Sequence, residues 1–550
     1  MGTASVHRRP ATASARTAAG LLLAAVLLSA CTSPAGPLAA PGADPTSGSP
    51  SSALATAPPA QSPATLTRAK VDAADGQLDQ VVRRAMDATG VPGLAVAVVY
   101  QDEVVYSKGY GVREVGRPDT VDPDTVFQLA SLSKPLASTV VAGAVDGKAV
   151  SWSDPVQQHD PGFTLQDPWV SSHLTLADLF AHRSGLPEHA GDLLEDLGYD
   201  RDYVLGHLRL EPLSPFRVTY DYTNFGLTEA AVAVARTKGI SWEQLSADTL
   251  YRPLGMNSTG STFADYQKAA DKAVLHVRTD GGWRAEYTRN ADAQSPAGGA
   301  SSSVQDMARW MRLQLGGGKF DGKQVVGAAA LQETHLPEIV INAPQAPGGR
   351  AGFYGLGWNV GYDEQARLRL NHSGAFALGA ATTVTLLPSE GLGIVVLTNG
   401  EPLGVPEAVA ASYLDIAQNG RETVDWLGAY GGLIGRMLQA GHSVTDYSEL
   451  PAGAAPARPD PAYAGSYAND YYGPLTVTSQ GGGLVMTLGP APGRQFPLQH
   501  FDGDTFSYRT VGENAVGLSG VTFTVDAGGS ASKVVVENLD HEHLGTFTRT

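Results

Sequence analysis

The apolar positions at the start of the folded chain repeat at helical spacing: Leu78, Val81, Val82, Ala85 and Met86. This pattern predicts an amphipathic helix, and Gly90 and Pro92 predict its end. Two Val-rich runs follow at residues 94–100 and 104–107, separated by three polar residues. Such runs on either side of a short polar turn predict a β-hairpin.

Strand patterns return much later, at residues 381–387 and 392–398. Between the hairpin and these strands, helical and strand patterns mix. A helix, a hairpin, a long helical middle and late strands together predict an α+β layer fold for residues 68–420.

The C-terminal part of the chain has a different pattern. Residues 426–440 predict a helix and Pro451-Ala-Gly-Ala-Ala-Pro456 predicts a linker, so residues 421–460 are expected to connect two domains. Residues 461–550 contain short alternating apolar runs between Gly and Asp turns, at 475–477, 484–488, 521–525 and 534–536. This spacing predicts a small all-β domain, either an antiparallel sheet or a barrel.

The first thirty residues have the features of a secretory signal. Three arginines precede an uncharged, largely apolar stretch at residues 18–30, which is too short to span a bilayer. It ends in Leu28-Ser-Ala-Cys31, which resembles the lipobox of bacterial lipoproteins, where the cysteine is lipidated and becomes the N-terminus. The sequence therefore predicts a lipoprotein signal peptide at residues 1–30 and a lipid on Cys31.

Cys31 is the only cysteine of the chain, so it cannot form an internal disulfide. The alternative to lipidation is that it is an incidental small residue in a cleaved peptide. Residues 31–67 are rich in Pro, Ser and Ala and predict a disordered tether. Together these features predict an exported protein held on the outer face of the cell membrane.

The chain is acidic, with 55 Asp and Glu residues against 38 Lys and Arg residues and a net charge of −17. An acidic surface repels a phosphate backbone, and no run of basic residues offsets that repulsion. Composition therefore excludes nucleic acid as the expected partner.

The strongest chemical signal is the pair Ser131 and Lys134, followed by a largely apolar stretch. Residues three apart on a helix lie on one face, so the lysine amine can contact the serine hydroxyl. A buried lysine can take the proton of a serine, which is otherwise a weak nucleophile. Pro135 requires this helix to begin at or just before Ser131. The alternative is a helix start with Ser131 as cap and Lys134 in solvent.

Tyr222 and Asn224 form a second candidate pair. In an extended chain, residues two apart point the same way, so a phenol and an amide would project into one cleft. Tyr222 could then carry a proton to a leaving group while Asn224 donates a hydrogen bond to a substrate amide. The alternative is a tyrosine-rich loop with ordinary packing.

A third candidate is the segment Asn371-His372-Ser-Gly374-Ala375, just before the strand at residues 381–387. Gly374 allows a close approach of the backbone, so the Ala375 N–H could hold an oxyanion together with the N–H of Ser131. His372 would line the same site. The alternative is a β-turn before a strand.

The motifs Ser-x-x-Lys, Tyr-x-Asn and His-x-Gly occur in this order and resemble the serine β-lactamase and penicillin-binding-protein superfamily, in particular its class C-like branch. The resemblance covers roughly residues 70–420 and includes further landmarks: Leu179-Phe-Ala-His-Arg-Ser-Gly-Leu-Pro187, Pro253-Leu-Gly-Met-Asn257, Ala297-Gly-Gly, Tyr354-Gly-Leu-Gly-Trp358 and Leu397-Thr-Asn399. It implies an antiparallel sheet between helices, a helical lobe, and a site between them. It also implies acylation of Ser131 and hydrolysis of the acyl-enzyme without a metal or cofactor.

One position departs from the family pattern. The lactamase branch usually has Lys where this chain has His372, and that charge helps to hold a substrate carboxylate. The resemblance therefore favours an esterase or a D-amino-acid peptidase or amidase, with cell-wall peptides among the candidate substrates. The alternatives are a β-lactamase, a D-alanyl-D-alanine carboxypeptidase, and a non-catalytic surface lipoprotein that binds penicillin or peptidoglycan. Residues 461–550 resemble a small β-domain of related hydrolases, and the hypothesis is that this domain limits substrate size.

Overall fold

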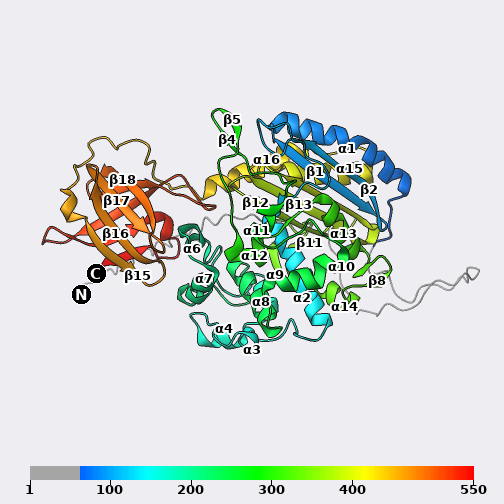
Figure 1. Ribbon diagram of the computed structural model, residues 1–550, viewed down its shortest axis with the longest axis horizontal. Coiled ribbons are helices and arrows are strands. Elements are labelled where there is room, and N and C mark those ends of the chain that lie inside the picture. The colour runs from blue at the N-terminus through cyan, green and yellow to red at the C-terminus, as the bar shows by residue number, and fades with distance from the viewer. Residues whose placement is uncertain (1–61, 364) are drawn as a thin grey trace, which may run out of the picture.

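The computed structural model of the chain describes residues 62–363 and 365–550 (Figure 1). The predicted signal peptide, Cys31 and most of the predicted tether lie outside the described residues. The first helix, α1, spans Arg68–Thr89 and ends at Gly90, which has a left-handed backbone conformation with a φ of 70°. Over the described ranges, no helix is both long enough and apolar enough to cross a membrane.

A central sheet of eight antiparallel strands runs in the order β2-β1-β14-β13-β12-β11-β10-β9. In chain order these strands are β1 (Gly93–Tyr100), β2 (Glu103–Gly111), β9 (Ile339–Asn342), β10 (Gly352–Tyr354), β11 (Asn359–Tyr362), β12 (Leu368–Phe376), β13 (Ala380–Leu387) and β14 (Leu392–Thr398). The N-terminal hairpin therefore pairs with the late strands.

Both faces of this sheet are covered. Leu94, Val96 and Val98 of β1 pack with α1 and α15 (Val405–Asn419), whereas Ala95 and Ala97 point into the larger core on the opposite side. Because both faces are buried, the strand is a continuous apolar run and does not alternate with polar residues.

Helices cover the second face and form a lobe beside it. The described helices here are α2 (Ser133–Asp146), α3 (Val156–His159), α4 (Pro168–His173), α5 (Leu176–Phe180), α6 (Asp192–Leu197), α7 (Arg201–His207), α8 (Asn224–Thr237), α9 (Trp242–Ser246), α10 (Arg252–Leu254), α11 (Phe263–Lys268), α12 (Ser295–Gly298), α13 (Val304–Leu315) and α14 (Ala328–Glu333). Short strand pairs join them: β3 (Phe127–Gln128) with β6 (Ser301–Ser302), β4 (Val277–Thr279) with β5 (Gly282–Arg284), and β7 (Lys319–Phe320) with β8 (Lys323–Gln324).

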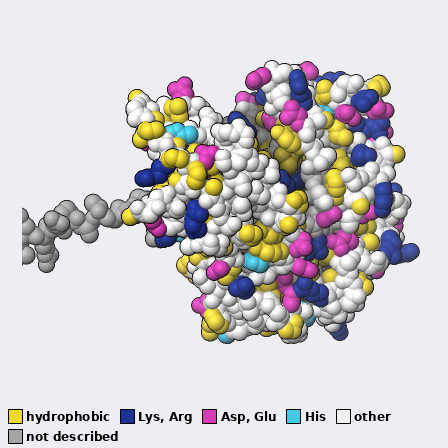
Figure 2. Space-filling model, turned by 60° about the vertical axis from the view of Figure 1, so that its left-hand side comes forward, with side chains coloured by type: hydrophobic (Ala, Val, Ile, Leu, Met, Phe, Trp, Pro, Cys, Tyr) yellow, Lys and Arg dark blue, Asp and Glu magenta, His cyan; other side chains and the backbone are white. Residues whose placement is uncertain are grey.

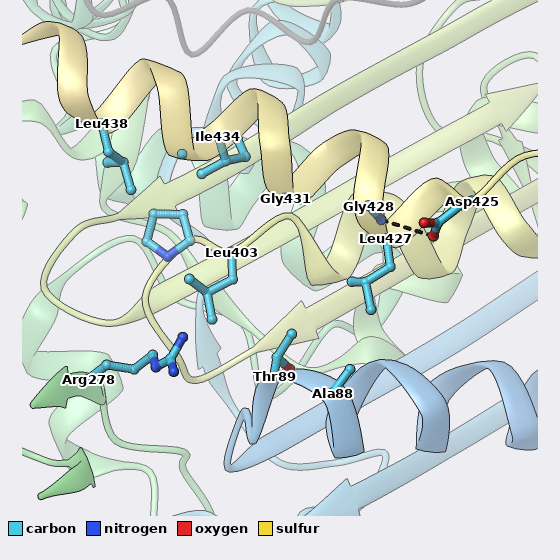
Figure 3. A pocket seen from close by; sticks show the side chains of 12 residues that line it. Ala88, Thr89, Arg278, Leu403, Asp425, Leu427, Gly428, Gly431, Ile434 and Leu438 are labelled. Carbon is cyan, nitrogen blue, oxygen red and sulfur yellow. Dashed lines mark hydrogen bonds between the residues drawn. The ribbon is translucent and has the colours of Figure 1, made fainter. Parts of the chain in front are cut away.

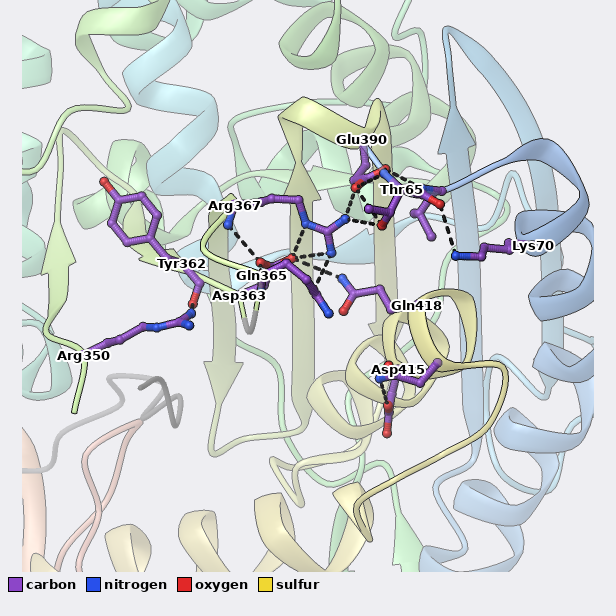
Figure 4. A network of polar contacts seen from close by, with 12 residues as sticks. Thr65, Lys70, Arg350, Tyr362, Asp363, Gln365, Arg367, Glu390, Asp415 and Gln418 are labelled. Atoms are coloured by element: carbon purple, nitrogen blue, oxygen red, sulfur yellow. Dashed lines mark hydrogen bonds and ion pairs between the residues drawn. The ribbon is translucent and has the colours of Figure 1, made fainter. Parts of the chain in front are cut away.

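A buried arginine fastens the start of the described chain to the sheet (Figure 4). Arg367 is fully buried and contacts two carboxylates, Asp363 at 2.7 Å and Glu390. Glu390 also accepts hydrogen bonds from the backbone N–H groups of Thr65 and Leu66. The segment before α1 is therefore held by the same ionic cluster that joins the β11–β12 connection to the β13–β14 connection.

A helix at residues 426–440 follows the sheet, as the sequence predicts: it is α16 (Trp426–Ala440). Beyond it, eight strands close into an antiparallel barrel: β15 (Gly465–Asn469), β16 (Gly473–Gln480), β17 (Gly483–Leu488), β18 (Arg494–Asp502), β19 (Thr505–Arg509), β20 (Leu518–Val525), β21 (Ala531–Val536) and β22 (Thr546–Arg549). The barrel is closed by the pairing of β15 with β22. The α+β fold is confirmed, and the C-terminal region forms a closed all-β barrel.

The barrel packs against the helical lobe at α6 and α7 (Figure 1). The Tyr471 hydroxyl accepts a hydrogen bond from the N–H of Gly191 at 3.1 Å, and the Tyr199 hydroxyl donates to the carbonyl of Tyr472 at 2.8 Å. The helical lobe and the barrel share one apolar core. The all-β domain is therefore an integral neighbour of the lobe.

Candidate active site

Ser131 lies on a single 3-10 turn, η1 (Ala130–Leu132), and the α-helix proper starts at Ser133. Ala130 has a φ of 49°, an unusual conformation for a residue with a side chain. The two residues on either side of Ser131, Ala130 and Leu132, are fully buried, whereas Ser131 itself is partly exposed. The turn therefore presents the serine hydroxyl at the surface of a site. Pro135 predicts a helix that begins at or just before Ser131; the 3-10 turn begins there, at Ala130, and the α-helix begins two residues after Ser131, at Ser133.

Lys134 is fully buried at the start of α2, with its Nζ against the serine. Nζ lies 3.1 Å from the Ser131 Oγ, 2.6 Å from the Asn224 Oδ1 and 3.1 Å from the Ala297 carbonyl oxygen. Burial lowers the pKa of Lys134 to about 7, and the charge of Asp192 opposes this shift. At neutral pH a large fraction of this lysine is therefore uncharged.

The three contacts of Nζ match the three N–H donors of an ammonium, and they also fit a neutral amine. A neutral amine has two N–H donors and one lone pair. The carbonyl oxygens of Asn224 and Ala297 can only accept, so they take the two donors. The lone pair is then left for the Ser131 hydroxyl proton, which is the arrangement that a general base requires.

Tyr222 covers the same lysine. Its ring centroid lies 4.4 Å from the Lys134 Nζ. Burial raises the pKa of Tyr222 above its ordinary value, so the phenol keeps its proton at neutral pH. Of the two groups beside Ser131, the lysine is therefore the one that changes charge near pH 7.

Asn224 reaches the site from a helix. The sequence predicts that Tyr222 and Asn224 lie in one extended segment, but Thr223 is the extended residue and Asn224 is the first residue of α8. That expectation is wrong in detail because the helix starts inside the motif. Both side chains still converge on Lys134, and the Asn224 Nδ2 donates to Asp192 at 2.8 Å.

The third motif lies on β12, directly against the serine turn. A Cβ on Gly374 would meet the Leu129 carbonyl oxygen at 2.1 Å and the Leu132 nitrogen at 2.8 Å, so only glycine fits here. The Ala375 backbone follows immediately and pairs with Ala381 of β13. The structure thus brings the backbone next to Ala375 within contact of η1.

His372 is buried on the same strand. Its Nδ1 lies 2.7 Å from the carbonyl oxygen of Ser373, so Nδ1 carries the proton and Nε2 accepts from the Tyr354 hydroxyl at 2.9 Å. Burial lowers the pKa of His372 to about 3, with a further contribution from the Lys134 charge. The imidazole is therefore neutral and supplies no positive charge to the site.

Sequence reasoning missed Asp192. Its carboxylate is buried in the first turn of α6, contacts Asn224, and lies 2.8 Å from the Nδ1 of His189. Asp192 and His189 belong to none of the three motifs. A single acid at the start of a short helix gives no sign of its tertiary contacts. Only packing of α6 against α8 brings this carboxylate to the site.

The barrel also reaches the edge of this site. In the loop between β19 and β20, the carboxylate of Glu513 accepts a hydrogen bond from the N–H of Ala377, two residues beyond Ala375, at 2.5 Å. Between this loop and α6 lies a cavity of about 1120 Å³, lined by residues of both domains, among them Asp196, Arg289 and Leu378. The end of β12 therefore leads from the serine towards a space that both domains enclose.

A second cavity, of about 470 Å³, lies between α16 and the end of α1 (Figure 3). Its walls are mainly apolar, with Leu403, Leu427 and Ile434 facing the space and Arg278 and Asp425 at its edges. No serine, histidine or lysine lines it. It therefore lacks a serine-lysine pair like that of Ser131 and Lys134, and the chemistry is expected at Ser131.

Acidic and basic side chains are interspersed over the face shown in Figure 2, without a continuous field of one sign.

In the part of the chain that the structure describes, no cluster of three or more His, Cys, Asp or Glu residues could hold a metal ion.

A family model described as Beta-lactamase matches residues 78–419, which include all three motifs. The chain belongs to the β-lactamase family. A second match, to a domain of unknown function (DUF3471), covers residues 449–546, which include most of the barrel.

Curated relatives of this β-lactamase family chain include hydrolases and carboxypeptidases. Unguisins hydrolase ungD' of Aspergillus campestris is 28% identical over 433 residues, which cover 74% of this chain and 78% of that protein. The D-alanyl-D-alanine-carboxypeptidase/endopeptidase AmpH of Escherichia coli is 24% identical, covering 59% of this chain and 84% of that protein.

Two solved structures share the fold. The octameric penicillin-binding protein homologue from Pyrococcus abyssi has a TM-score of 0.55 at 18% identity, covering 84% of this chain and 98% of that chain. A class C β-lactamase from Rhodobacter sphaeroides has a TM-score of 0.51 at 24% identity, covering 62% of this chain and 98% of that chain. The fold is therefore that of the β-lactamases and transpeptidases.

Proposed function

We propose that this β-lactamase family chain is a serine hydrolase that forms an acyl-enzyme on Ser131 and cleaves ester or amide bonds. The observation that supports it most is the contact between the Ser131 Oγ and the Nζ of Lys134, 3.1 Å apart, in a site where burial lowers the pKa of that lysine to about 7. A neutral amine at hydrogen-bond distance is what a serine nucleophile requires at physiological pH.

The reaction follows from the positions of these groups. The Ser131 Oγ attacks the substrate carbonyl carbon while its proton moves to the Lys134 Nζ, and the N–H groups of Ser131 and Ala375 hold the resulting oxyanion. The Tyr222 hydroxyl donates a proton to the leaving alcohol or amine and regains one from Lys134. Water then attacks the acyl-enzyme, releases the acid and returns the proton to Ser131.

His372 supports the choice of substrate class. A neutral imidazole, hydrogen-bonded to Tyr354, cannot form an ion pair with a substrate carboxylate. This favours an esterase or a D-amino-acid peptidase or amidase, on peptide substrates that include cell-wall fragments, over a β-lactamase or a D-alanyl-D-alanine carboxypeptidase. The relative named as a D-alanyl-D-alanine-carboxypeptidase/endopeptidase fits a family that includes hydrolysis of peptides.

The barrel is proposed to limit the size of the substrate. Its loop places Glu513 against Ala377 and forms one wall of the 1120 Å³ cavity at the end of β12. A long substrate that extends from Ser131 past the end of β12 would meet this loop. We also propose that Cys31 carries a lipid and that the protein lies on the outer face of the membrane. Membrane fractionation of the parent and of a Cys31→Ser variant would test both.

The experiment is labelling with a fluorophosphonate, followed by intact-mass and peptide-mapping analysis, on the chain lacking residues 1–31. We expect one adduct, on the peptide that contains Ser131, and none in Ser131→Ala. Ser133→Ala is the matched control, because this neighbouring hydroxyl donates to the Ala130 carbonyl and lies in the same turn. The labelled enzyme class is then assigned with nitrophenyl esters and D-alanyl amides.

An absence of any adduct in folded protein would overturn the proposed hydrolase. Rapid adduct formation with a penicillin but no turnover of any ester or amide would instead favour a penicillin-binding surface lipoprotein.

A further inference from the structure

We propose that Asp192 is a positioning residue of the catalytic centre, which fixes the orientation of the Asn224 amide and keeps a negative charge beside Lys134. The inference rests on the proposed hydrolase and goes beyond it, because it assigns a role to α6, which carries none of the three motifs. It also identifies contacts that connect the barrel to the segment that carries Asp192.

The first argument is geometric. Asp192 is 3% exposed, and its Oδ2 accepts a hydrogen bond from the Nδ2 of Asn224 at 2.8 Å. A carboxylate can only accept, so it selects the amide orientation in which Nδ2 faces α6. The other end of the amide, Oδ1, is then left to accept from Lys134 at 2.6 Å.

The orientation matters for the base. If the Asn224 amide were reversed, its N–H would compete with the Ser131 hydroxyl for the Lys134 lone pair. The amine would then have one acceptor fewer and would be rotated away from the serine. Asp192 prevents this state without touching the serine or the substrate.

The second argument is electrostatic. Lys134 is buried and its three hydrogen-bond partners are uncharged, so the nearest compensating charge matters. Asp192 raises the pKa of Lys134 against the effect of burial. The other titratable groups that face these two residues are Tyr222, His182 and His372 around the lysine, and His189 and Glu195 around the carboxylate.

The third observation is that α6 is held from both sides. On the catalytic side, the N–H of His189 donates to the Tyr222 carbonyl at 2.8 Å. On the barrel side, the N–H of Gly191 donates to the Tyr471 hydroxyl, and the Asp196 carboxylate accepts from the N–H of Glu513 at 2.8 Å. The helix that carries Asp192 and the residues just before it are therefore hydrogen-bonded to the Tyr-x-Asn motif on one side and to the barrel on the other.

Two variants separate the charge of Asp192 from its hydrogen bond. Asp192→Asn keeps an oxygen that accepts from Asn224 and removes the charge. Asp192→Ala removes both. The readout is the rate of Ser131 labelling by a fluorophosphonate as a function of pH, on the full-length chain, together with kcat and KM for a nitrophenyl ester.

For Asp192→Asn we expect the midpoint of the acidic limb to move down by about one pH unit, because the lysine cation loses a favourable charge. The plateau rate at higher pH should stay near that of the parent. For Asp192→Ala we expect the same downward movement and, in addition, a plateau lowered by about 10- to 100-fold through kcat, because the amide of Asn224 is no longer oriented.

The matched control is Asp415→Asn. Asp415 is another buried carboxylate, 6% exposed, which accepts hydrogen bonds from the Thr423 N–H and the Trp426 Nε1 on the far side of the sheet. We expect neither its midpoint nor its plateau to change.

An unchanged midpoint in both Asp192 variants, with labelling intact, would overturn the inference and leave the hydrolase in place, since a purely structural carboxylate would lower only the thermal stability. A parent that is not labelled at Ser131 would overturn both proposals. A midpoint shift in the Asp415→Asn control would also count against the inference.

Discussion

Lys134 and Arg367 are both fully buried cations, but their surroundings differ. The three hydrogen-bond partners of the Lys134 Nζ are a hydroxyl, an amide and a backbone carbonyl. Arg367 is paired directly with two buried carboxylates, Asp363 and Glu390 (Figure 4). The same burial therefore destabilises the charge of the lysine and leaves the charge of the arginine compensated.

The difference shows how one fold assigns two roles to buried positive charge. A cation without a carboxylate in contact loses its hydration, and its pKa falls, so it becomes a base near neutral pH. A guanidinium between two carboxylates cannot release its proton and serves to hold segments together. We expect variants at the two positions to have opposite consequences for activity and for stability.

The largest effect is expected for Lys134→Met. Loss of the proposed general base should lower kcat/KM by about a hundred- to ten-thousandfold. The free energy of unfolding should fall by no more than about 1 kcal/mol, because the desolvation cost of the ammonium disappears together with its three hydrogen bonds. Ester hydrolysis and urea unfolding measure the two quantities, and retained activity would contradict the role of the lysine.

Arg367→Met should show the reverse pattern. The variant leaves the buried carboxylates of Asp363 and Glu390 without a counter-charge, which costs about 3–5 kcal/mol of unfolding free energy. The kcat of the folded fraction should stay unchanged, because Arg367 contacts no residue of the site. The control is Lys70→Met, which removes an exposed amine that contacts the Thr65 carbonyl in the same cluster and should change stability by less than about 0.5 kcal/mol. A smaller loss in Arg367→Met than in this control would contradict the structural role.

The smallest change is expected from pH alone. The pKa of Lys134 is lowered, so the lysine is protonated below about pH 7 and neutral above it. Protonation removes the base, so kcat/KM should fall about tenfold for each pH unit below that midpoint and level off above it. Initial rates between pH 5 and 9 measure this, and a flat profile would exclude Lys134 as the titrating group.

Several features could be predicted from local sequence because they depend on local geometry. Ser131 and Lys134 share a face because three residues make nearly one helical turn. The Val-rich run of β1 indicates a strand, and the alternating runs after residue 461 indicate the all-β domain, because side-chain period follows secondary structure directly. Gly374 is required where β12 meets η1, and the glycine in the sequence predicted this close approach of the backbone because it has no side chain.

Asp192 shows where such reasoning ends. Its role depends on α6, a helix of six residues, packing between α8 and a barrel more than 250 residues away in sequence. No periodicity or motif records such a contact. The same holds for Glu513, whose carboxylate reaches Ala377 only because the barrel is docked on the lobe.

The sequence by itself predicted the first helix, the first hairpin, two late strands, the helix at 426–440, the C-terminal all-β region and the candidate nucleophile and base, because these follow from spacing and side-chain chemistry. Only the tertiary structure decided that Lys134 is buried among uncharged partners, that the Asn224 amide is fixed by a carboxylate, and that Arg367 is compensated by two acids. The physical reason is that pKa values and hydrogen-bond orientation depend on what surrounds a group in space, and long-range packing sets those surroundings.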